Sequence, residues 1–128
     1  MEFTYAKVAG TEILGVKLTG EFDLDKAQNS FLDLLDVVKR EKTDKVLVDG
    51  TAVTGEPETF QRFLYAAFAA MAVSDLNEHP GERILKFAYA LRPPVLDPER
   101  FGETVALNRG MNVKTFESVQ EARDWLAG

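Results

Sequence analysis

The sequence predicts an α/β domain with the element order ββαβαβαβα, in which four helices cover a five-stranded mixed sheet. Short apolar runs alternate with segments whose apolar residues recur at helical spacing, and this alternation is typical of a largely parallel sheet. Two strand-like segments joined by a short turn at the N-terminus add an antiparallel edge. The length of 128 residues is close to the commonest domain size, so we expect one domain over 1–128.

The first two strands are expected at 3–9 and 13–19. Polar and apolar side chains alternate in the first segment, and the second carries a more continuous apolar run. Residues 10–12 begin with glycine and can connect the two strands as a hairpin, while Gly20 ends the second strand.

The first helix is expected at about 25–41. Asp25 is a candidate N-cap, with Gln28 three residues later as its capping-box partner. Apolar residues follow at helical spacing and predict one buried stripe: Ala27, Phe31, Leu34, Leu35 and Val38.

The central part of the chain is expected to hold a buried strand, a loop and a second helix. The apolar run 45–49 predicts a strand covered on both faces, and 50–56 is expected to be a loop. Pro57 suits the first turn of a helix that continues to about Leu76. That helix is apolar around most of its circumference, which indicates that it is covered on more than one side.

The C-terminal part continues the alternation of strands and helices. Residues 84–91 predict a strand, 97–110 a helix with Asp97 as its cap and Pro98 in the first helical position, and 113–116 a last short strand. Ser118 followed three residues later by glutamate forms a capping box that begins the final helix.

Composition excludes several classes of function. The formal net charge of −6 makes general binding to nucleic acids unlikely, because an acidic protein repels phosphate backbones. The absence of cysteine excludes disulfides and thiolate metal ligands. His79 is the single histidine and is expected in a surface turn, so we expect no metal site and no cofactor. No signal peptide or membrane-spanning run is evident, which favours a cytoplasmic protein.

Motifs for catalysis are also missing from the sequence. No Gly-x-Ser-x-Gly elbow and no glycine-rich dinucleotide loop occurs. An acid-based site would need Asp49, Glu56 or Glu58 in a desolvated cleft, and paired acids in loops are usually solvated. We therefore expect a protein that is not an enzyme.

The element order resembles that of the STAS domain, the fold of bacterial anti-sigma-factor antagonists. The chain is most similar to the SpoIIAA-like branch, which is related in fold to the Sec14 (CRAL-TRIO) lipid-binding proteins. Three stretches carry the resemblance: the strand 45–49 that ends in Asp49, the helix end 106–110, and the closing segment 113–126 with Phe116, Glu121-Ala122 and Trp125-Leu126.

The resemblance implies a regulatory or scaffolding module that acts through protein–protein contacts. STAS antagonists carry an Asp-Ser pair, whose serine is phosphorylated, at the start of the helix after the central strand. This chain has Glu56-Pro57 near that place, and the nearby hydroxyls of Thr51, Thr54 and Thr59 do not match the motif. The resemblance therefore does not carry the phosphorylation switch over to this chain.

The candidate binding site is the region that follows the central strand. The segment 50–55 is the nearest feature to an anion cradle, although a plain strand-to-helix connection is the favoured explanation. The aromatic residues of the second helix suit either core packing, a homodimer or partner surface, or the wall of a pocket for a lipid or other apolar small molecule. The candidate residues are Asp49, Thr51, Thr54, Glu56, Thr59, Phe60, Phe63 and Phe68.

Overall fold

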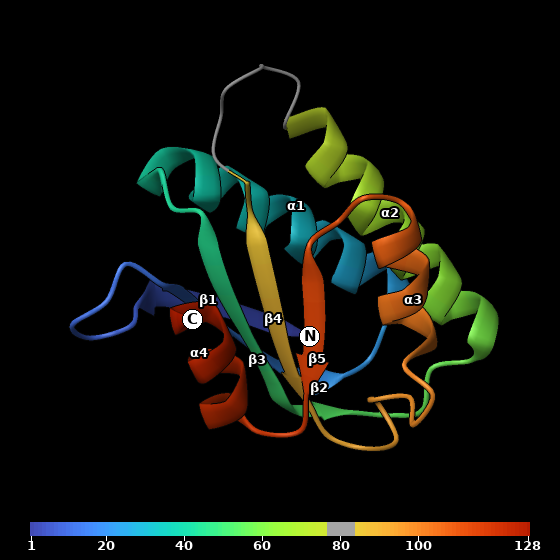
Figure 1. Cartoon of the computed structure of the whole chain (residues 1–128). Helices are drawn as coiled ribbons and strands as arrows, with labels where there is room; N and C mark the ends of the chain where they lie inside the picture. The colour runs from blue at the N-terminus through green and yellow to red at the C-terminus, as the bar shows by residue number, and fades with distance from the viewer. Residues whose placement is uncertain (77–83) are drawn as a thin grey trace.

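A computed structural model of the chain describes residues 1–76 and 84–128, so that His79 lies outside the described residues. Five strands form one sheet in the order β1-β2-β3-β4-β5 (Figure 1). Their bounds are Glu2–Lys7 for β1, Leu14–Glu21 for β2, Lys45–Thr54 for β3, Lys86–Leu91 for β4 and Val113–Phe116 for β5. β1 is antiparallel to β2 and all other neighbours are parallel, which confirms the mixed sheet expected from the sequence.

Four helices cover the two faces of the sheet unequally (Figure 1). Helices α1 (Leu24–Glu41), α2 (Thr59–Leu76) and α3 (Phe101–Asn108) lie on one face, and α4 (Val119–Ala127) lies on the other. The apolar stripe expected on the first helix is buried as predicted. The larger core therefore lies under α1, α2 and α3.

Alternation along β3 divides its side chains between the two cores. Val46 and Val48 belong to the larger core, whereas Leu47 packs with Ala122 and Leu126 of α4. Successive side chains of a strand point to opposite faces. The apolar run 46–48 is therefore covered on both faces, as expected from the sequence for a central strand.

The prediction that 50–56 is a loop is wrong for residues 50–54, because β3 continues to Thr54. After a shift of register between Lys17 and Thr19, β2 pairs with this extension, so that Val53 lies beside Gly20. Gly50 interrupts the apolar run and looks like a loop signal, but it lies within β3 and next to the side chain of Leu91 from β4. An added Cβ there would lie 2.7 Å from a methyl carbon of Leu91.

The helix starts predicted for α1 and α2 differ from those in the structure. The prediction of Asp25 as the first N-cap is wrong, because the carboxylate of Asp23 accepts a hydrogen bond from the N–H of Lys26 at 3.0 Å. Helix α2 begins at Thr59 and not at Pro57. Its start is closed by the side chain of Gln61, which accepts from the N–H of Glu58 at 2.9 Å.

The start of α3 is also later than the sequence predicts. Residues 97–100 close a turn, in which the N–H of Arg100 donates to the carbonyl of Asp97 at 3.0 Å. Arg100 has a left-handed conformation with φ 57°, which interrupts the helix, and the carboxylate of Asp97 accepts from the N–H of Phe101 at 2.8 Å. The cap predicted at Ser118 is confirmed, since Ser118 Oγ accepts from the N–H of Glu121 at 3.1 Å.

Candidate binding surface of helix α2 and the pocket beneath it

Helix α2 exposes an apolar stripe on its outer side. Phe60, Leu64 and Met71 have exposed fractions of 58%, 41% and 60% and lie at spacings of four and seven residues along the helix. The inner side is buried through the small residues Ala66, Ala69, Ala70 and Val73. Arg62 and Asp75 are its only charged residues. The helix is therefore apolar on both sides but is covered by the described chain on one side only.

The other two aromatic candidates on α2 lie on its flanks. Phe63 is exposed, and the guanidinium of Arg109 lies 5.1 Å from the centre of its ring. Phe68 is half-buried. Core packing, one of the alternatives expected from the sequence, therefore does not describe Phe60 or Phe63.

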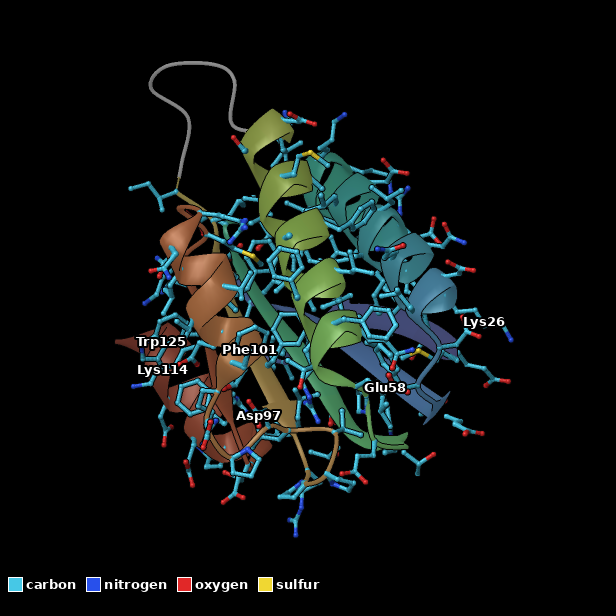
Figure 2. All side chains as sticks on the ribbon, turned by 90° about the vertical axis from the view of Figure 1, so that its right-hand side faces the viewer. Lys26, Glu58, Asp97, Phe101, Lys114 and Trp125 are labelled. Atoms are coloured by element: carbon cyan, nitrogen blue, oxygen red, sulfur yellow. The ribbon has the colours of Figure 1, made fainter. Side chains whose placement is uncertain are left out.

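A shallow groove lies at the start of α2, beyond the carboxyl ends of β3 and β4. Glu56, Thr59 and Phe60 form one wall, and the segment that contains Pro94 and Asp97 forms the other. Figure 2 shows Glu58, at the start of α2, and Asp97, before α3, at this same end of the molecule. Ligands often bind at this end of open α/β sheets. The structure thus brings three of the predicted residues together.

The remaining three candidates do not line this groove. The carboxylate of Asp49 accepts from the N–H of Thr51 at 3.1 Å and from its hydroxyl at 2.7 Å. Asp49 alternates with Val48 along β3 and so points to the face of the sheet that carries Leu47 and α4, and its two hydrogen bonds hold Thr51 beside it. Thr54 ends the strand and is exposed. Because residues 50–54 belong to the sheet, the anion cradle expected at 50–55 is not formed.

A pocket of about 140 Å³ lies beneath α2, between this helix, α3 and the sheet. Its lining is almost entirely apolar and includes Ala66, Ala69 and Met111. Two tyrosines also line it, Tyr65 from α2 and Tyr89 from β4. The sequence offered a pocket wall as one alternative for this helix, but it pointed to Phe60, Phe63 and Phe68, none of which lines the pocket, and not to Tyr65. The one signal was that Tyr65 falls off the face shared by the phenylalanines of the helix.

The two tyrosines, Tyr65 half-buried and Tyr89 buried, form a polar pair in the apolar lining of the pocket. Their hydroxyl oxygens lie 2.8 Å apart and their rings meet edge to face at 84°. Burial raises the pKa of Tyr65 to about 12, although the hydrogen bond with Tyr89 opposes this shift. Burial also raises the pKa of Tyr89 well above 10.0, and the neighbouring Tyr65 adds to the effect. Both hydroxyls are therefore protonated at neutral pH.

Polar side chains at the border of the pocket are engaged with each other or with the backbone. Arg62 donates to the carbonyls of Val95 at 2.6 Å and Pro94 at 2.8 Å. Arg100 donates to the hydroxyl of Thr115 at 2.7 Å, and this hydroxyl donates to Glu103 at 2.9 Å. These bonds hold the segment before α3 in place. The charged groups of Arg62, Arg100 and Glu103 are all hydrogen-bonded to the protein itself.

Within residues 1–76 and 84–128, no three histidine, cysteine or acidic side chains lie close enough together to hold a metal ion. In the same described part of the chain, no helix has the combination of length and hydropathy that crossing a bilayer requires.

Comparisons with known proteins find likeness only among solved structures. No family model matches the chain, and no curated protein matches it significantly. The structure is similar to that of an anti-sigma factor antagonist from Mycobacterium paratuberculosis, with a TM-score of 0.59 and 14% sequence identity. It is also similar to a variant of RsbS from Moorella thermoacetica, with a TM-score of 0.57 and 16% identity. Each comparison covers 99% of this chain and 96% of the other.

This likeness confirms the fold expected from the sequence. The chain has the STAS/SpoIIAA-like α/β architecture of anti-sigma factor antagonists over nearly its whole length. At identities of 14% and 16% the likeness concerns the fold alone.

Proposed function

We propose that this protein is a non-enzymatic regulatory or scaffolding module of the cytoplasm that binds another protein through the outer side of α2. The observation that supports this proposal is the exposed stripe of Phe60, Leu64 and Met71 on a helix that is nearly free of charge. One of the two similar structures supports it at a coarser level, since its name describes an anti-sigma factor antagonist.

The chemistry of the stripe suits the centre of a protein interface. Aromatic side chains and methionine are enriched in such centres, and charged side chains are depleted there. Phe60 also borders the groove that contains Glu56 and Thr59, so that an apolar centre adjoins a polar rim. Each large apolar side chain that a partner covers fully stabilises the complex by about 1.5–3 kcal/mol before the costs of association.

The test compares three forms of the protein as bait in extracts of its native host. F60Q/L64Q removes the centre of the stripe with residues that favour helices, and I84Q is the matched control, because Ile84 is 76% exposed and lies outside α2. We expect a stoichiometric partner to bind the wild type and I84Q and to be lost from F60Q/L64Q. Circular dichroism checks that all three are folded.

Equal capture by all three forms, or no stoichiometric partner for any of them, would contradict the proposal. A second copy of the chain is the other possible occupant, and sedimentation velocity distinguishes it. In that case the wild type sediments as a dimer of 14.3 kDa chains and F60Q/L64Q as a monomer.

The second candidate function is a carrier or sensor of a lipid or other apolar small molecule. The apolar pocket beneath α2 favours it. The volume of about 140 Å³ is below the roughly 300–1,000 Å³ of pockets that hold drug-sized ligands, so it suits a small molecule better than a lipid chain.

A further inference from the structure

The pocket beneath α2 has the size of a single small ring. Its volume of about 140 Å³ is close to that of an engineered apolar cavity of about 150 Å³ that binds benzene. Small side chains create the space, because alanines 66, 69 and 106 line it where larger residues would fill it. All three are buried and belong to α2 or α3.

The tyrosine pair gives this apolar space one polar feature. Two phenol groups carry two hydroxyl hydrogens, and a hydrogen bond between them uses one. Tyr65 and Tyr89 bond to each other at 2.8 Å, and no other hydrogen bond to either hydroxyl is found among the described residues. The pair therefore has one O–H hydrogen left to donate to a ligand.

The charged side chains that border the pocket have partners already. Arg62 holds two backbone carbonyls, Arg100 and Glu103 are bridged by Thr115, and Asp97 caps α3. Burying a charged ligand without a free counter-ion costs several kcal/mol. The pocket therefore favours a neutral ligand.

We propose that this pocket binds a neutral molecule of one aromatic or aliphatic ring that carries a single hydrogen-bond acceptor, with the Tyr65–Tyr89 pair donating to that acceptor. The site is distinct from the proposed protein-binding stripe, since it lies on the opposite side of α2. Its occupancy does not depend on whether the stripe binds a partner.

Two probes of nearly equal shape test the site. Acetophenone has a ring and one carbonyl acceptor, and ethylbenzene replaces the carbonyl by a methylene group. At ten times its dissociation constant, acetophenone is expected to raise the Tm by roughly 5 °C. Intermolecular NOEs are expected from the bound ring to the methyl groups of Ala69 and Met111, which both line the pocket.

Two matched substitutions separate filling of the pocket from general overpacking. A69L places extra carbons in the pocket and is expected to abolish both the NOEs and the rise in Tm. A70L adds the same group at a buried position of the same helix that does not line the pocket, and it is expected to retain binding.

The tyrosine pair is tested by Y65F/Y89F, which removes both hydroxyls. The variant is expected to bind acetophenone about fivefold more weakly and ethylbenzene with unchanged affinity, since a net hydrogen bond contributes about 1 kcal/mol. Absence of NOEs to Ala69 and Met111 in the wild type would overturn the proposal, whatever the stability of the variants. Equal weakening of both probes in Y65F/Y89F would overturn the role of the hydroxyls.

Discussion

The hydroxyl oxygens of Tyr65 and Tyr89 lie 2.8 Å apart where the inner side of α2 meets the sheet. The residues are 24 positions apart in the sequence and come from a helix and a strand. Each supplies the other with a hydrogen-bond partner in an apolar environment, so the effects of changing them are coupled.

Removing the first hydroxyl of this pair is expected to lower the free energy of unfolding more than removing the second hydroxyl afterwards. Tyr65→Phe or Tyr89→Phe leaves a buried hydroxyl without its partner and is expected to lower the free energy of unfolding by about 1–3 kcal/mol. The double variant is expected to be more stable than the sum of the two losses predicts, because neither hydroxyl remains. Urea denaturation of the four proteins measures this coupling. Additive losses would show that the hydroxyls act independently.

Stability is expected to fall in alkaline solution because of the same pair. The pKa of Tyr65 rises from 10.0 to about 12 on folding, and that of Tyr89 also rises, so the folded state disfavours ionisation. Their contribution is complete below pH 10 and is lost as pH rises through 10 towards 12. Urea denaturation at intervals from pH 8 to pH 11.5 measures the decline. If the stability of Y65F/Y89F declined with pH as much as that of the wild type, groups other than these tyrosines would be the cause.

Arg62 is expected to hold the segment before α3 by its forked guanidinium. It donates through two different nitrogens to the carbonyls of Val95 and Pro94. Arg62→Lys keeps the charge but loses the fork, so it is expected to lower the free energy of unfolding by about 1–2 kcal/mol and to speed proteolysis between residues 92 and 100. Arg109→Lys is the control on α3's C-terminal side. Equal cleavage of both variants would contradict this role for Arg62.

The start of α1 distinguishes two neighbouring aspartates. Asp23 accepts a hydrogen bond from the N–H of Lys26, so Asp23→Ala is expected to cost about 1 kcal/mol of unfolding free energy. Asp25 makes no such cap and contributes only its charge in the first turn, so Asp25→Ala is expected to cost less than about 0.5 kcal/mol. Chemical denaturation at low and high salt compares them. A larger loss of unfolding free energy for Asp25→Ala than for Asp23→Ala would indicate that Asp25 is the N-cap, as the sequence alone predicts.

The close contact of β3 with β4 is expected to depend on Gly50. Gly50→Ala places a methyl group 2.7 Å from the far end of the Leu91 side chain, which must shift, and is expected to cost about 1 kcal/mol. Leu91→Ala removes the obstructing carbons, so adding it to Gly50→Ala is expected to cost less than the two single changes together. Thermal unfolding of the three variants measures this relationship, and strict additivity would argue against the contact as the cause.

The sequence alone determined the number, order and type of the elements. Periodicity of apolar residues is a local property, so the strand 45–49 and the buried stripe on α1 could be predicted from it. The cap at Ser118 could be predicted for the same reason, because a capping box involves residues only three positions apart. The fold resemblance rests on this order and is confirmed by the similar structures.

Contacts between segments that are distant in the sequence determined the extension of β3, the exposed side of α2 and the tyrosine pair. β3 extends to Thr54 because β2 supplies a pairing partner after a shift of register, and no local signal reports that partner. The choice of which apolar side of α2 faces solvent depends on where the sheet and α3 lie. The Tyr65–Tyr89 pair and its pocket likewise arise only when α2 packs on β4, since residues so far apart in sequence meet only in the folded chain.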